Sequence, residues 1–205
     1  MEGGIYMKNT KRWYKILLVS LVLILLTGCE FGTVKKKEKD MSKIHHIKIE
    51  VENMGIIEAE LDGLTAPITV DNFIALANSG FYNGSSFHRI ISGFMVQGGS
   101  PAGVGYGGSG KTIKGEFANN GVRNDISHVR GVISMARGDD NDSASSQFFI
   151  VHKDSTYLDG NYAGFGHVTG GMEVVDKIAE TPVEDSNGGT LPENRPIIKT
   201  ITVVD

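Results

Sequence analysis

The sequence predicts a mainly β domain of roughly eight strands and two short α-helices, folded as a closed antiparallel barrel or a sandwich. The chain has 27 glycines but only 5 prolines among 205 residues, which is typical of many tight turns and irregular loops. Short apolar segments bounded by glycine or polar residues recur, and only two segments show helical periodicity. So few helices between strands disfavour parallel pairing, and the length suits one domain over residues 44–205.

The first predicted element is a β-hairpin. Two segments of alternating apolar and polar residues, 44–52 and 56–62, are separated by a short turn that contains Asn53 and Gly55. Ile47 and Val51 fall on the same side of the first strand as Ile49. The alternation predicts two antiparallel strands with one face buried.

The remaining elements follow from shorter patterns. Pro67 suits the first turn of a helix and Gly80 its far end, with apolar residues between them at helical spacing. The apolar face of Met172–Glu180 predicts a second helix. Further strands are predicted within the segments 87–99 (FHRIISGFMVQGG), 131–137 (GVISMAR), 146–152 (SQFFIVH) and 196–205 (PIIKTITVVD).

The N-terminal residues show the pattern of an export signal. Four basic residues precede the apolar run 16–26, whose helix would rise about 16 Å and is too short to cross a hydrocarbon core of ~30 Å. Leu26-Thr27-Gly28-Cys29 resembles the lipobox of bacterial lipoproteins, and Cys29 is the only cysteine in the chain. The resemblance implies a signal peptide over 1–28 and a lipidated, palmitate-bearing Cys29. A stray cysteine beside a simple cleaved signal is the alternative.

Residues 29–43 are polar and lysine-rich, which predicts a flexible tether between membrane and domain. The predicted location is the extracytoplasmic face of a bacterial cell membrane. Without residues 1–28 the chain has 16 basic and 23 acidic residues, a formal charge of −7. This acidic balance argues against a nucleic-acid partner. We expect a monomer.

One glycine-rich stretch matches a nucleotide-binding motif. Gly105–Thr112 (GYGGSGKT) fits G-x-x-x-x-G-K-[ST], but a P-loop needs a strand before it and a helix after it. Glycine and asparagine residues follow Thr112, so no nucleotide is expected. The six histidines form no HExxH pair and no cysteine cluster is present, so we expect no metal and no cofactor.

A stronger pattern lies in residues 87–99. Arg89, Met95 and Gln97 stand at even spacings and would share one face of an extended segment, unless a bend at Gly93 interrupts the register. A cation, a soft apolar group and an amide on one surface suit a peptide site. A partly exposed strand with an incidental arginine is the alternative.

Four motifs in order give a resemblance to a known family. The segment 87–99, with VISMAR (132–137), SQFFI (146–150) and YLDGNYAGFGHV (157–168), resembles the cyclophilin family of peptidyl-prolyl cis-trans isomerases. The resemblance covers about residues 44–205. It implies a cyclophilin-like fold, a closed eight-stranded antiparallel β-barrel capped by two short α-helices. It also implies catalysis of X–Pro bond rotation, whose barrier is ~18–20 kcal/mol.

The resemblance also implies the site residues. Arg89 matches the catalytic arginine, and Gln97 matches the amide that binds substrate backbone and orients that arginine. The remaining substrate-binding positions are Phe94, Met95, Phe149 and Leu158 around the proline ring, Ala136, Arg137 and Gln147 along the groove, and Tyr157 and Tyr162 at the rim, where many eukaryotic members have tryptophan and histidine. The implied partners are proline-containing unfolded or partly folded polypeptides.

Two functions remain open from the sequence. The first is a membrane-tethered isomerase that assists the folding of exported proteins, since slow X–Pro isomerisation limits folding. The second is a proline-binding module or chaperone whose isomerase activity is incidental.

Overall fold

The computed structural model describes residues 43–101, 103 and 105–205. The predicted signal peptide, Cys29 and all of the tether except Lys43 lie outside these residues. The elements are β1 (Ile44–Val51), β2 (Gly55–Asp62), α2 (Pro67–Asn78), β3 (Arg89–Ile91), β4 (Met95–Gly98), η1 (Ala118–Asn120), β5 (Val132–Met135), β6 (Phe148–Val151), η2 (Thr156–Leu158), β7 (Gly164–Gly170), α3 (Met172–Ala179), η3 (Pro192–Asn194) and β8 (Ile198–Val203). None of the described helices is long and apolar enough to span a membrane.

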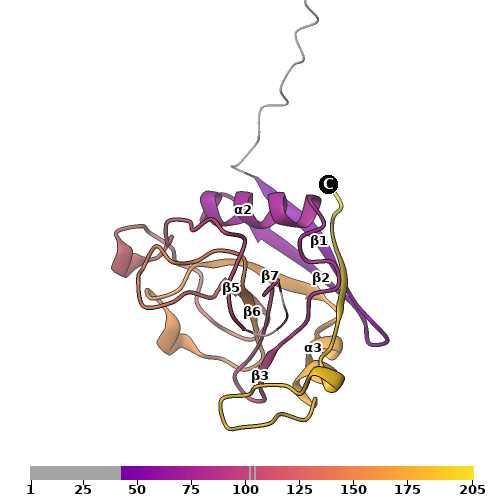
Figure 1. The fold of residues 1–205 in the computed structure, drawn as a ribbon. Helices are drawn as coiled ribbons and strands as arrows, with labels where there is room; N and C mark the ends of the chain where they lie inside the picture. Colours follow the sequence, from indigo (N-terminus) through magenta and orange to yellow (C-terminus); the bar gives the residue numbers. More distant parts are fainter. Residues whose placement is uncertain (1–42, 102, 104) are drawn as a thin grey trace, which may run out of the picture. The chain divides into compact units, whose positions relative to one another are not determined.

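The hairpin and both helices form as predicted. Ile47, Ile49 and Val51 are buried while Lys48 is exposed, so the alternation places one face of β1 in the core. The helix α2 begins at Pro67, and α3 ends one residue before the predicted bound. Figure 1 shows the two helices at different ends of the sheet, and α2 packs against β8 while α3 packs against β2 and β4.

The eight strands form one antiparallel sheet in the order β3-β4-β6-β5-β7-β2-β1-β8. The prediction of a closed barrel is wrong, because no ladder joins the edge strands β3 and β8 and the sheet is an open half-barrel. The chain just before β3 meets β8 instead, through the isolated Ser86–Ile197 bridge and a 2.8 Å bond from the Ile198 N–H to the Ser85 carbonyl. That contact ends before the three-residue β3 begins.

Strand β7 was not among the predicted strands. It contains Gly164, Gly166 and Gly170, which resemble loop residues in a sequence read alone. In the sheet, a Cβ at Gly166 would collide with the Glu60 carbonyl of β2. Glycine therefore serves here to let two strand backbones approach closely.

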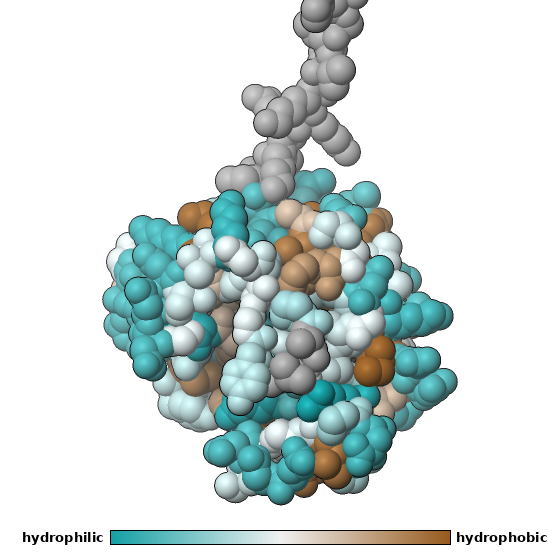
Figure 2. Space-filling model, viewed as in Figure 1, coloured by the Kyte–Doolittle hydropathy of each residue, from teal (hydrophilic) through white to brown (hydrophobic). Residues whose placement is uncertain are grey.

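Apolar side chains form two clusters, one on each face of β6. Phe148 and Ile150 belong to the main core, where the Phe148 ring packs edge-on against Phe73 at 5.2 Å between centroids. Phe149 and Val151 belong to a smaller cluster on the other face. In the view of Figure 2, hydrophilic residues cover most of the surface and hydrophobic ones form small separate patches. The smaller cluster underlies the candidate site.

Candidate active site

The β3–β4 hairpin brings Arg89, Met95 and Gln97 together. Arg89 lies directly opposite Gln97 in the antiparallel register, and its Nη1 donates to Gln97 Oε1 at 3.3 Å and lies 3.9 Å from Met95 Sδ. Gly93, with φ of 79°, forms the turn between the strands. The three side chains therefore meet across a hairpin and not along one extended strand, because the glycine bend interrupts the predicted register.

A second contact to Arg89 comes from a distant loop. Arg89 Nε donates to the Asn187 carbonyl at 2.9 Å, and the Ile90 N–H donates to the Gly188 carbonyl at 2.7 Å. The loop between α3 and β8 thus runs beside β3 and fixes the guanidinium from one side. Nothing in the sequence pattern indicated this contact, because it joins residues almost one hundred positions apart.

The exposed side of the smaller cluster forms a pocket of about 210 Å³. Two arginines and a glutamine line it together with apolar and aromatic side chains. Its lining consists of Arg89, Phe94, Met95, Gln97, Ala136, Arg137, Phe149, Leu158 and Tyr162. Nine of the predicted site residues, from four separate segments of the chain, therefore line one cavity.

The aromatic floor of this pocket is held from behind. The Phe149 ring stacks on the buried His128 at 6.1 Å between centroids and meets the Tyr162 ring edge-on at 5.9 Å. His128 Nδ1 lies 2.8 Å from Asp159 Oδ1, and Nε2 lies 2.9 Å from Ser134 Oγ. An ionised carboxylate only accepts hydrogen bonds, so Nδ1 carries the proton and Nε2 accepts from the serine.

The charges in this network follow from burial. Burial lowers the pKa of His128 against the opposing effect of the Asp159 hydrogen bond. Partial burial works to raise the pKa of Asp159, but hydrogen bonds from Ser127 and His128 together lower it. The imidazole is therefore neutral and the carboxylate ionised. Together they connect the turn that contains Leu158 to strand β5, which pairs with Phe149 of β6.

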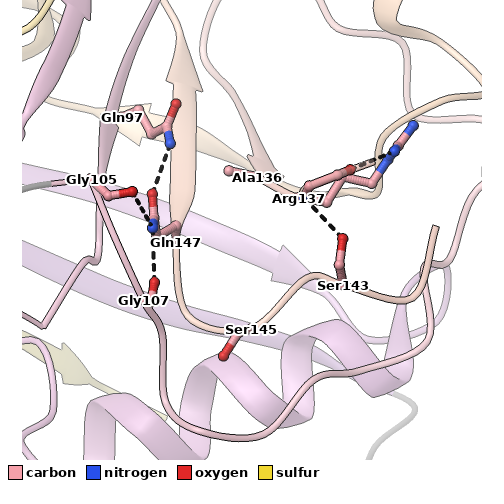
Figure 3. A pocket seen from close by; sticks show the side chains of 9 residues that line it. Gln97, Gly105, Gly107, Ala136, Arg137, Ser143, Ser145 and Gln147 are labelled. Carbon is pink, nitrogen blue, oxygen red and sulfur yellow. Dashed lines mark hydrogen bonds between the residues drawn. The ribbon is translucent and has the colours of Figure 1, made fainter. Parts of the chain in front are cut away.

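A second hollow of about 300 Å³ adjoins the pocket and shares Gln97, Ala136 and Arg137 with it. Figure 3 shows the glycine loop on one side of it and Arg137 on the other. The rest of its lining consists of Gly105, Gly107, Gly138, Ser143, Ser145 and Gln147. The two serines, which lie just ahead of the SQFFI motif, are site residues that the sequence analysis missed.

Gln147 joins the glycine loop to strand β4. Its Oε1 accepts from Gln97 Nε2 at 2.9 Å, while its own Nε2 donates to the carbonyls of Gly105 and Gly107 at 3.1 and 2.9 Å. The stretch Gly105–Thr112 therefore borders the hollow with its backbone. No helix follows it in residues 113–117, so the geometry of a P-loop is absent there.

Arg137 lies between the two cavities. Its Nε donates to the Asn161 carbonyl at 3.0 Å and Nη1 to the Gly138 carbonyl at 2.9 Å. Its guanidinium carbon lies 4.9 Å from the Tyr162 ring centroid and 5.2 Å from that of Phe117. Carbonyls and aromatic faces thus hold the cation in place.

Comparison with known proteins identifies the fold. The sequence model of the family described as "Cyclophilin type peptidyl-prolyl cis-trans isomerase/CLD" matches residues 46–203. The chain belongs to the cyclophilin family. It is 43% identical over 156 residues to a peptidyl-prolyl cis-trans isomerase of Helicobacter pylori, covering 75% of this chain and 92% of that one. It is 44% identical over 145 residues to isomerase B of Bacillus subtilis, covering 71% and 93%.

A solved structure agrees with these relatives. A cyclophilin of Cryptosporidium parvum, crystallised in the presence of the dipeptide Ala-Pro, superposes with a TM-score of 0.69 at 31% identity, over 78% of this chain and 99% of that one. This cyclophilin is therefore a peptidyl-prolyl cis-trans isomerase, EC 5.2.1.8.

Two predicted residues of this cyclophilin lie outside the lining of the pocket. Gln147 borders the adjoining hollow, and Tyr157 is 69% exposed with its ring 5.9 Å from that of Phe94. The described residues contain no group of three histidine, cysteine, aspartate or glutamate side chains arranged to hold a metal ion.

Proposed function

We propose that Arg89 is the catalytic residue of this cyclophilin and that the 210 Å³ pocket receives the substrate proline. The observation that carries the proposal is that a fixed guanidinium and a buried aromatic wall line one cavity. Arg89 has no carboxylate within ion-pair distance among the described residues. Its charge is therefore available to a bound peptide.

The proposed mechanism is electrostatic. Rotation about an X–Pro bond removes amide resonance and returns a lone pair to the proline nitrogen, with a barrier of ~18–20 kcal/mol. Nε of Arg89 is held by Asn187 and Nη1 by Gln97, and no hydrogen bond joins Nη2 to another described residue. We assign Nη2 as the donor that stabilises the twisted amide more than the planar one.

The other residues bind and orient the substrate. Phe94, Met95, Phe149 and Leu158 provide the apolar surface for the proline ring, and Gln97 binds peptide backbone and orients Arg89. Residues beside the proline lie in the adjoining hollow, against Ala136, Arg137, Gln147 and the glycine loop. Tyr157 and Tyr162 form the rim.

The catalytic role of Arg89 is tested by Arg89→Ala. Removing a preorganised donor costs about 10²–10³-fold in rate, so we expect a loss of this order in kcat/KM on a proline tetrapeptide with an unchanged Tm. Arg89→Lys should recover only part of the activity, because an ammonium lacks the planar fork. Arg123→Ala, an exposed arginine paired only with Asp125, is the matched control. Near-full activity in Arg89→Ala would remove the residue from this role.

We further propose that the enzyme is exported and tethered to the membrane through lipid on Cys29, acting on proline-containing unfolded chains outside the cytoplasm. The support is the sequence alone: the apolar run 16–26, the lipobox-like 26–29 and the lysine-rich residues 35–39. Mass spectrometry of the membrane-extracted protein should find Cys29 as a lipidated N-terminus, and Cys29→Ser should release the protein from membranes. An unmodified cysteine on a membrane-free chain would contradict the tether.

A further inference from the structure

Two arginines at the proposed site differ in their partners from Arg123 and Arg130. Arg123 pairs with Asp125 at 2.6 Å and Arg130 with Asp176 at 2.7 Å. Arg89 and Arg137 donate only to carbonyls, an amide oxygen and a thioether sulfur, and no carboxylate in the described residues pairs with either. The chain after residue 28 has a formal charge of −7. Arg195, the remaining described arginine, also lacks a carboxylate partner and donates to Thr190, but it does not line either cavity.

The charge of Arg137 has no partner in the proposed isomerisation step. Arg89 supplies the donor for the twisted amide, and a neutral amide at position 137 could equally donate to substrate backbone. Yet the Arg137 guanidinium is half-buried and fixed by three carbonyls and two aromatic rings. A preorganised cation of this kind loses little side-chain entropy when it binds a carboxylate.

The carboxylates near Arg137 have other partners, so a ligand would have to supply a carboxylate that pairs with it. The adjoining hollow is lined by glycine, alanine, serine and glutamine beside Arg137, with no acidic side chain. The nearby Asp140 and Asp142 carboxylates accept backbone N–H groups of Asp142 and Gly115. Asp159 is engaged by His128.

We propose that Arg137 makes this cyclophilin selective for substrates with an acidic side chain at one of the two residues ahead of the proline. The inference rests on the proposed function, because it takes the 210 Å³ pocket as the proline site and the hollow next to it as the place of the preceding residues. Arg137 borders both cavities, so a chain that leaves the first for the second passes the guanidinium. Glutamate or aspartate there supplies the missing counter-ion.

The test compares acetyl-capped tetrapeptides, Ac-Ala-Xaa-Pro-Phe-amide and Ac-Xaa-Ala-Pro-Phe-amide, with Xaa as Glu, Gln or Lys. The acetyl cap avoids a second carboxylate, and exchange NMR with the full-length chain avoids a coupling protease. For a partly exposed ion pair we expect the Glu peptide to exceed the isosteric Gln peptide about three- to fivefold in kcat/KM at one position. The Lys peptide should fall below Gln, and molar salt should bring all three together.

Two variants show whether Arg137 causes the preference for the Glu peptide. In Arg137→Gln the Glu/Gln ratio should fall to about one, whereas Arg123→Gln should keep the wild-type ratio. Equal rates for Glu and Gln at both positions in the wild type, or a ratio that persists in Arg137→Gln, would overturn the inference. Failure of the proposed site is a separate result, because it would appear as full activity of Arg89→Ala on the neutral Gln peptides.

Discussion

The two apolar clusters on either face of β6 differ in what encloses them. The main core is sealed by the sheet and both helices, and contains rings such as Phe73, Tyr82 and Phe148 packed against one another at 5.1–5.7 Å. The smaller cluster is backed by a polar network and opens into the pocket beside Arg89. Adjacent residues of one strand thus belong to the main core on one side and to the proposed substrate site on the other. The predictions below test this division.

The largest expected effect on stability is at Phe148. Phe148→Ala leaves a cavity in a fully buried cluster, and such truncations cost about 3–5 kcal/mol in the free energy of unfolding. Urea denaturation measures it. An unfolding midpoint close to wild type would contradict the assignment of this face to the main core.

Phe149→Ala should lower activity strongly and stability only moderately. The ring is buried but borders the pocket, where solvent can replace it, so the stability loss should be smaller than at Phe148. Loss of an apolar surface for the proline ring is worth about 1.5–3 kcal/mol, or roughly 10- to 100-fold in kcat/KM. Exchange NMR on a tetrapeptide gives the rate. If both variants lost stability equally and Phe149→Ala kept its activity, the assignment of one face of β6 to the core and the other to the site would be wrong.

The polar network predicts a pH dependence of stability. Burial lowers the pKa of His128 in the folded protein, so the unfolded chain binds a proton more readily and stability falls as pH drops below about 6.5. His128→Gln should flatten the slope of the urea midpoint between pH 7 and 5, although it lowers the midpoint at pH 7. A slope that stays at the wild-type value in His128→Gln would contradict this assignment.

The smallest effect on stability is expected at the rim of the pocket. Tyr157 is 69% exposed, with its ring 5.9 Å from that of Phe94, so Tyr157→Ala should change stability by less than ~0.5 kcal/mol. Any effect on catalysis should appear in KM more than in kcat. A large loss of stability would place Tyr157 inside the cluster.

Much of this organisation could be predicted from the sequence, because local patterns carry it. Alternation in Ile47–Val51 and the proline at the start of α2 gave the correct elements, and the four motifs named the residues that line the pocket. Phe148 and Phe149, neighbours on one strand, belong to opposite clusters. The signal, the lipid and the tether lie outside the described residues and stay predictions.

What the sequence could not supply depends on contacts between distant segments. The sheet is open, since the closing contact with β8 is made by residues 84–87 and not by β3. Strand β7 was hidden by glycines that the neighbouring backbone requires. The Asn187 carbonyl that holds Arg89 and the hydroxyl of Ser134 behind the pocket have no local signal, because each acts through a partner far along the chain or across the sheet.

The most direct test of the central claim, that the pocket on the outer face of β4 and β6 receives proline, is an NMR titration of the isotope-labelled protein with Ala-Pro. Amide shifts should concentrate in β4, β6 and residues 136–137, with weaker changes in the glycine loop. They should be much reduced in Phe149→Ala. Shifts that centre on another surface, or that survive unchanged in Phe149→Ala, would contradict the account.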